Sequence, residues 1–241
     1  MDYKDQTKGG VNRSHNKSIV EKSVFMTGHF LIVMFCCWLI TFEGFDKITG
    51  AFGLDWTLVD TQRAYILLAC AALYWLRHAI TLFYLLQRKV EWSEVFGLLS
   101  FIALFEVTLT LIGAGVFRSI VIPLSSLDVL AMALLLIGSY LNSASEIQRK
   151  WWKQDPANKG HCYTDGLFKY SMHMNYFGDT VLFTGWCLLT YNYWTLALPI
   201  FMAASFVGFH IPNLDSYLVE RYGNEFRAYA KKTKKFIPFV Y

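Results

Sequence analysis

The sequence predicts an all-α, polytopic membrane protein with about six transmembrane helices. Two features of the composition favour this fold class: 55% of the residues are hydrophobic and 17% are aromatic, more than a typical soluble domain contains. A third feature is that several apolar stretches reach the roughly 20 residues that a membrane-spanning helix needs. The chain is therefore expected to be embedded in a membrane.

The predicted spans follow one another with short polar connections. A long apolar run near the C-terminal end is interrupted at Tyr191, Asn192 and Tyr193, so it is expected to form a hairpin of two helices. The first span is longer than the apolar core of a signal peptide, so it is interpreted as a retained anchor. The chain then divides into a polar tail, expected to be disordered, and one transmembrane domain. The tail is 1–23, the domain is 24–241, and the apolar runs are 24–42, 64–86, 95–117, 119–141 and about 178–210.

Basic residues are concentrated on one side of this topology. Loops on the side that bears the N-terminus hold eighteen Lys and Arg residues, whereas the other side holds only Lys47, Arg63 and Arg118. Because cytoplasmic loops are enriched in Lys and Arg, both termini are predicted to be cytoplasmic, in the endoplasmic reticulum or a bacterial inner membrane. The net charge of +4 follows the topology and does not indicate nucleic acid as a partner. The five cysteines lack disulfide or metal-ligand spacing, so no metal is predicted.

Two charged residues lie inside predicted spans. Arg77 and Glu106 lie at depths that differ by roughly 3 Å in neighbouring helices. A charge at the bilayer centre costs roughly 2.5–3.5 kcal/mol and normally has a partner, so these two residues are expected to pair. The pair is either a structural link or one wall of a polar cavity, in which the nearby Tyr74 hydroxyl can donate a proton.

A polar stripe follows the fourth span. Asn142, Glu146, Arg149 and Lys153 are spaced 4, 3 and 4 residues apart, which places them on one face of a helix that Pro156 ends. An amide, a carboxylate and two cations suit a ligand that has hydroxyl or amide groups together with phosphates. The alternative interpretation is a solvated helix face.

A compact motif, TDGLFKYSMHMNYFGD, occupies residues 164–179, just before the chain re-enters the membrane. A plain loop has no need for so many polar and aromatic groups at a helix entrance. Together with the stripe, the motif predicts a cytoplasmic cofactor-binding region. Its candidate binding residues are Tyr170, His173, Asn175, Tyr176 and Asp179.

This motif resembles the glycine-leucine-aromatic…tyrosine-serine-arginine-histidine-proline-asparagine-tyrosine-phenylalanine-glycine-glutamate signature of the steroid 5-alpha-reductase family. The likeness is greatest to the smaller relatives, long catalogued as a domain of unknown function, which are related to isoprenylcysteine methyltransferase-like membrane proteins. Asn142 with Glu146, the tail from Arg221 through Arg227 to the closing FIPFVY, and the stretch from Tyr74 to Arg77 are also similar. The resemblance covers about 74–84 and 138–241.

The resemblance implies a membrane-embedded, NADPH-dependent oxidoreductase that reduces a conjugated carbon–carbon double bond in a lipid or steroid-like enone. It implies Tyr74 as the catalytic acid, and Arg77 with Glu106, expected to pair because of their depths, complete the candidate catalytic residues. The implied partners are the lipid-like substrate and membrane lipids, and no protein partner is implied. The candidate cofactor-binding residues of such an enzyme, from the stripe, the motif and the tail, are Asn142, Glu146, Arg149, Lys153, Tyr170, His173, Asn175, Tyr176, Asp179 and Arg227.

The sequence also departs from the family pattern. Met172 and Met174 stand where the relatives usually have arginine and proline, and the catalytic glutamate of the steroid enzymes has no convincing match. One alternative is a membrane methyltransferase of the isoprenylcysteine type, which has a similar architecture and motif but uses S-adenosylmethionine. Another is a lipid-binding member that has lost its chemistry. Binding of NADPH, of S-adenosylmethionine or of neither separates the three.

Overall fold

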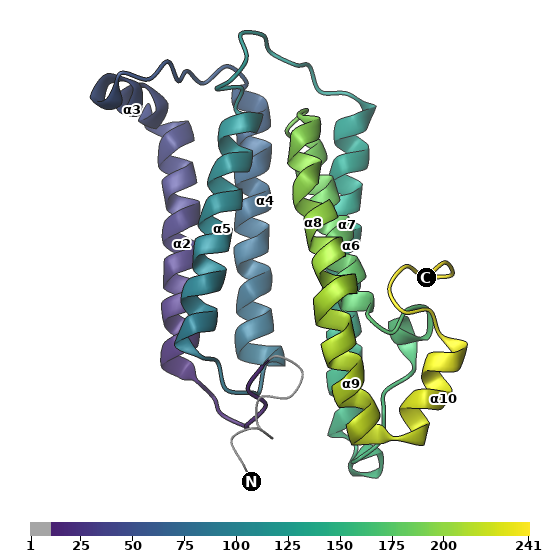
Figure 1. Cartoon of the computed structure of the whole chain (residues 1–241). Helices are drawn as coiled ribbons and strands as arrows, with labels where there is room; N and C mark the ends of the chain where they lie inside the picture. The colour runs from purple at the N-terminus through teal and green to yellow at the C-terminus, as the bar shows by residue number, and fades with distance from the viewer. Residues whose placement is uncertain (1–10) are drawn as a thin grey trace.

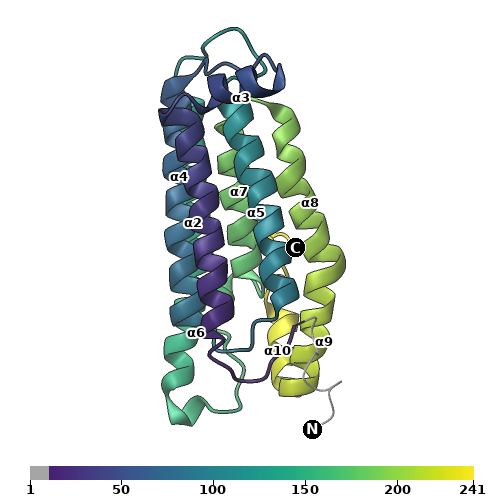
Figure 2. The ribbon, with the colours of Figure 1, turned by 90° about the vertical axis from the view of Figure 1, so that its left-hand side faces the viewer.

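The computed structural model of the chain describes residues 11–241, and within this range it consists of helices and loops without a β-strand. One group of helices contains α2 (Ile19–Thr41), α4 (Thr61–Ala79) and α5 (Trp92–Gly113), which stand side by side (Figure 1, left). The second group is formed by helices α6 to α9 (Figures 1 and 2). The bounds of the second group are α6 Ser126–Gln154, α7 Met174–Leu188, α8 Ala197–Ser205 and α9 Ile211–Tyr222.

Five helical segments are long and apolar enough to cross a membrane, which confirms the prediction of an all-α, polytopic membrane protein. The second segment joins α4 to the π-helix Ile80–Leu85, and the fifth joins α8 and α9 through the π-helix Phe206–His210. The expected sixth span corresponds to α7, whose 15 residues are about 22 Å long, shorter than the hydrocarbon core of a bilayer. The five segments are Ile19–Thr41, Thr61–Leu85, Trp92–Gly113, Ser126–Gln154 and Tyr193–Tyr222.

The turn of the C-terminal hairpin is confirmed, because α7 ends at Leu188 and the short 3₁₀ helix Tyr193–Leu196 begins the next segment. The predicted span 119–141 is wrong at both ends, because α6 runs from Ser126 to Gln154. Pro123 disfavours helix in the residue before it, and Ser125 with Asp128 forms the capping box that starts the helix. The polar stripe therefore belongs to the same continuous helix as the span.

The predicted tail also differs. Helix α2 already begins at Ile19, and residues 11–18 lie against the loop between the π-helix and α5. The Lys89 amide donates to the Ser14 carbonyl at 2.8 Å, and Asn12 Nδ2 donates to Glu91 Oε1 at 2.8 Å. The expected disorder of residues 1–10 lies outside the described residues. At the opposite end of the bundle, the short helix α3 (Gly44–Phe52) forms in the segment expected to be a loop (Figure 1).

Close contact between α6 and α7 positions the two polar motifs. A Cβ atom added to Gly138 would lie 2.2 Å from the Leu182 amide nitrogen, and one added to Gly178 would lie 2.6 Å from the Asn142 nitrogen. Such distances are too short for any side chain, so glycine lets the two backbones meet, as small residues commonly do between membrane helices. As a result, the stripe on α6 faces the start of α7.

Candidate functional site

The polar stripe lies on α6, as predicted, and three of its four residues, Glu146, Arg149 and Lys153, line a cavity of about 240 Å³ at the inner end of the bundle, the end that holds residues 11–18. Arg149 Nη2 donates to Glu146 Oε2, while Glu146 Oε1 is buried and has no hydrogen-bond partner among the described residues. Three cations therefore stand beside one carboxylate that retains a free acceptor. The charged lining residues are Glu146, Arg149, Lys150 and Lys153.

The second motif meets the stripe at the start of α7. Asn142 Nδ2 donates to the Asn175 carbonyl at 3.0 Å, so the two regions recognised in the sequence are joined. The Tyr176 ring stacks between His173, at 5.7 Å, and Phe206, at 4.6 Å. Met172 and Met174, which depart from the family pattern, are both buried side chains.

The His173 ring has a partner that the sequence analysis missed. This ring is buried, and its Nε2 lies 2.9 Å from Asp215 Oδ1 on α9. Asp215 is the first charged residue after a long apolar stretch that begins at Thr180, which is the signal that could have drawn attention to it. The pair ties the start of α7 to α9, and its acidic member also lies 3.7 Å from Lys235 Nζ.

Two predicted cofactor residues lie on the exposed surface. Tyr170 is exposed and packs on Phe239, with ring centroids 5.6 Å apart. Arg227 is exposed on α10 (Asn224–Lys232), where Nη1 donates to Asn224 Oδ1 at 3.2 Å. Neither residue lines the cavity beside Glu146.

The predicted pair between Arg77 and Glu106 is wrong. Arg77 Nη1 donates to Asp179 Oδ1 on α7 at 2.8 Å, and Glu106 Oε1 lies 2.9 Å from His29 Nε2 on α2. Similar depth in the membrane was a correct criterion for a partner. However, α7 brings the Asp179 carboxylate to Arg77, and α2 brings the His29 imidazole to Glu106. Asp179, which was predicted to bind the cofactor, is the ion-pair partner of Arg77.

Tyr74 lies at the centre of a buried aromatic cluster. Its ring is 4.3 Å from the His78 ring and 5.7 Å from the His29 ring, and Phe105, Phe183 and Trp186 surround it. His29 Nδ1 lies 3.2 Å from His78 Nδ1, and both histidines were missed as candidates. Glu106 Oε2 and Arg77 Nε are buried without a hydrogen-bond partner among the described residues. A phenol and two imidazoles of this kind can hold and transfer protons.

The segment before α2 also reaches the inner end. The Arg13 guanidinium lies 3.8 Å from the Tyr217 ring on α9. Burial lowers the pKa of Arg13 from its ordinary value, and the neighbouring Arg88 and Arg149 lower it further, whereas Tyr217 raises it. Arg13 was not selected as a candidate from the sequence, because the tail that contains it was expected to be disordered.

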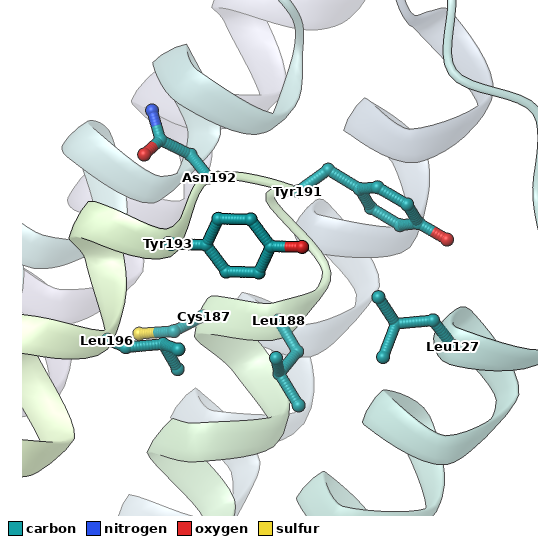
Figure 3. A pocket seen from close by; sticks show the side chains of 7 residues that line it. All are labelled: Leu127, Cys187, Leu188, Tyr191, Asn192, Tyr193 and Leu196. Carbon is teal, nitrogen blue, oxygen red and sulfur yellow. The ribbon is translucent and has the colours of Figure 1, made fainter.

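The outer end of the bundle holds a different kind of polar group. Arg63 is fully buried and bonded to Asp60 and Asp128, and the Tyr191 hydroxyl donates to Asp128 at 2.9 Å. The hollow beside this turn has a volume of about 20 Å³ and is lined largely by apolar side chains such as Leu127 and Leu196 (Figure 3). That is room for about one water molecule.

The fold and site thus define a helical membrane protein with a cationic cavity at its inner end and a buried aromatic, ionisable cluster within the bundle. The chain belongs to the family described as protein of unknown function (DUF1295), whose model matches residues 71–233. The match includes Tyr74, Arg77, the stripe on α6 and the motif at α7, but not the segment before α2.

Two curated proteins are similar to parts of the chain, and both are named as O-methyltransferases. The probable O-methyltransferase ustE of Ustilaginoidea virens is 33% identical over 86 residues, which are 35% of this chain and 30% of that protein. The protein-S-isoprenylcysteine O-methyltransferase of Schizosaccharomyces pombe is 28% identical over 115 residues, 46% of this chain and 49% of that protein. The chain therefore matches less than half of each relative's length.

Proposed function

We propose that the chain is a membrane-embedded enzyme that transfers a methyl group from S-adenosylmethionine to an oxygen atom of a lipid-like substrate. The observation that carries this proposal is that both curated relatives are named as O-methyltransferases. Their similarity supports enzymatic activity in general more firmly than it supports any one substrate, because each alignment covers only part of the relative.

The residues of the inner cavity fit this cofactor. Glu146 Oε1 is a buried acceptor without a hydrogen-bond partner in the described part of the chain, and it can receive hydrogen bonds from ribose hydroxyls or from the ammonium group of the cofactor. Arg149, held in place by Glu146 Oε2, can bind the cofactor's carboxylate. When bound, S-adenosylmethionine supplies an electrophilic methyl group.

The chain's own residues then have to orient the acceptor and exclude water. The buried rings around Tyr74 form an apolar interior next to the two histidines. Methylation of a hydroxyl group releases one proton, which an imidazole can accept, whereas methylation of a carboxylate releases none. Arg77, whose Nε has no hydrogen-bond partner within residues 11–241, provides a cation for an anionic acceptor in the same region.

A second candidate function is the NADPH-dependent reduction of a conjugated enone, which the resemblance to steroid 5-alpha-reductases implies. A specific observation favours it: the cavity is lined by three cations and one carboxylate, a balance that suits the phosphates of NADPH better than a cofactor that itself carries a positive sulfonium. In this reaction Tyr74 would donate a hydrogen bond to the substrate carbonyl, where negative charge develops.

One titration of the purified protein separates the candidates. Binding of S-adenosylmethionine that Glu146→Ala weakens about 10- to 100-fold supports methyl transfer, since a hydrogen bond to a charged group contributes roughly 1.5–3 kcal/mol. Asp165→Ala removes an exposed carboxylate outside the cavity and is the matched control, expected to bind normally. Binding of NADPH instead, with the same dependence on Glu146, would replace the first proposal by the second. Failure to bind either cofactor would favour a non-catalytic lipid-binding protein.

The orientation in the membrane is part of the same proposal, because a soluble cofactor must reach the inner cavity from the cytoplasm. Both termini are therefore proposed to be cytoplasmic, on the basis of the eighteen-to-three distribution of basic residues. Single cysteines introduced at 50–60 and at exposed positions in 155–165 should be labelled from opposite sides of the membrane. Labelling of both from one side would overturn the orientation.

A further inference from the structure

A second cavity lies beside the first at the inner end of the bundle. It has a volume of about 360 Å³ and is formed by the segment before α2, the start of α2 and the end of the π-helix after α4. Among the described residues that line it, four are basic and none is aspartate or glutamate. The basic residues are His15, Lys17, Lys22 and Lys150.

Two of these ammonium groups are fixed in position by the protein. Lys22 is buried, and Nζ donates to the Leu86 carbonyl at 2.7 Å, which uses one of its three N–H donors. Lys150 Nζ donates to the Tyr84 carbonyl and lies 3.4 Å from the Tyr84 ring. Backbone carbonyls thus hold two cations at one cavity, and the described residues of its lining include no acidic side chain that would neutralise them.

The position of the cavity indicates where its ligand comes from. It lies at the beginning of the first candidate span and at the end of the second, which is the level at which apolar chains give way to polar headgroups. Ile19 and Phe83 line it and leave 60% and 54% of their surfaces exposed. A ligand that fills it therefore meets cations and exposed apolar side chains together.

We propose that this cavity binds an anionic phospholipid, with the headgroup phosphate among Lys17, Lys22 and Lys150 and an acyl chain along Ile19 and Phe83. Basic pockets between membrane helices on the cytoplasmic side suit such headgroups, because the cations gain a counter-charge while the acyl chains stay in the bilayer. This site adjoins the proposed cofactor site, and Lys150 and Gln87 line both cavities. The proposal does not depend on which reaction the chain catalyses.

The test uses the full-length protein in nanodiscs of phosphatidylcholine alone or with one-fifth phosphatidylglycerol. Retained lipid is counted by native mass spectrometry, and affinity is measured by titrating phosphatidylglycerol into the protein in detergent. Phosphatidylglycerol should be retained in preference to phosphatidylcholine, and Lys17→Glu should weaken its binding about 10-fold or more. Lys169→Glu, an equal charge change at an exposed residue outside the cavity, should alter binding less than about 2-fold.

Three results would overturn the proposal. Equal retention of the two lipids would remove the preference for an anion, and equal effects of Lys17→Glu and Lys169→Glu would show general surface attraction only. Inorganic phosphate that displaces phosphatidylglycerol at low millimolar concentration would show a site for a free anion. If Lys17→Glu lowers expression, Lys17→Gln serves in its place, with at least a 3-fold weakening expected. S-adenosylmethionine and NADPH are left out of all arms, so the outcome is independent of the proposed enzymatic activity.

Discussion

Helix α4 carries two buried arginines, and they differ in how completely their hydrogen bonds are satisfied. Arg63, at the outer end, donates from Nε to Asp60, from Nη1 to Asp128 and the Leu189 carbonyl, and from Nη2 to the Ile122 carbonyl. Arg77, nearer the inner end, donates from Nη1 to Asp179, while its Nε is buried and without a partner among the described residues.

The difference distinguishes a structural junction, whose polar groups are nearly all hydrogen-bonded, from an interior in which buried polar atoms remain available to a ligand. The partners of Arg63 come from the ends of α4, α6 and α7, so one guanidinium joins both groups of helices. Among the buried side-chain atoms that the structure describes in this outer network, Arg118 Nε alone lacks a hydrogen-bond partner. Away from this outer network, by contrast, Glu106 and Glu146 each retain a buried oxygen without a hydrogen-bond partner among the described residues. Buried polar atoms are normally hydrogen-bonded, so these atoms favour a ligand beside them.

The largest expected effect is the loss of the outer junction. Arg63→Met should lower the free energy of unfolding by about 3–5 kcal/mol, because Asp128 would be left buried without a counter-charge and Asp60 would keep only Arg118. Lys47→Met removes an exposed cation at the same end and should change stability by less than about 0.5 kcal/mol. Chemical unfolding in detergent measures both variants. Equal stability of the two would show that Arg63 is not a junction.

The next effect concerns catalysis at the inner half rather than stability. If the reaction is enone reduction, Tyr74→Phe should lower turnover about 10²–10³-fold, because a donor to the developing negative charge acts mainly in the transition state. The buried ring contacts remain, so the unfolding free energy should change little. Single-turnover oxidation of bound NADPH with a long-chain enone measures the rate. A folded variant with the parent's rate would exclude Tyr74 as the acid.

A smaller loss of stability is expected at the second arginine. Arg77→Met should cost about 1–3 kcal/mol, less than Arg63→Met, because Asp179 keeps 21% of its side chain exposed and can be hydrated after its partner is lost. The same unfolding assay applies, and Arg77→Met should also impair the reaction. If Arg77→Met destabilised the protein as much as Arg63→Met, the contrast between the two ends of α4 would disappear.

Sequence reasoning predicted helix type and the hairpin turn well, because these depend on local apolar length and on turn residues. It did not predict the partners of Arg77 and Glu106, since depth in the membrane says nothing about which way a helix is rotated. His29 escaped notice because it is one uncharged residue in a long apolar run, yet it is the partner of Glu106. Asp215 is 42 residues from His173, so only the folded chain brings them together.

The predicted boundaries of the fourth span and of the N-terminal tail were wrong for a related reason. The apolar residues before Ser126 look like part of a span, although Pro123 and the capping box place them outside α6. The segment before α2 looks like a polar tail, although Asn12 and Ser18 are buried against the rest of the protein. In both cases the composition was interpreted correctly as apolar or polar, but the contacts that decide the boundary lie outside the local sequence.

The last prediction concerns packing at the inner end, away from its two cavities. It tests whether the side chains there are packed as tightly as those at the outer end. Cys162 lies between α6 and α7, with Met172, Phe226 and Tyr229 packed around it, and burial raises the pKa of its thiol to about 11. An ordinary cysteine has a pKa near 8.5, so at pH 7.5 this thiol should form roughly 300-fold less thiolate, the reactive species.

Alkylation of Cys162 by iodoacetamide, followed by mass spectrometry of its peptide, should therefore be at least about 100-fold slower than in the unfolded chain. The rate should rise as the pH approaches 11, because the fraction of Cys162 that is present as thiolate rises with pH. Lys159→Cys introduces a thiol at an exposed position of the same loop and should react rapidly. If Cys162 reacted as fast as that control, the layer formed by α10 and the loop before α7 would be open, and the inner end would be loosely packed as well as incompletely hydrogen-bonded.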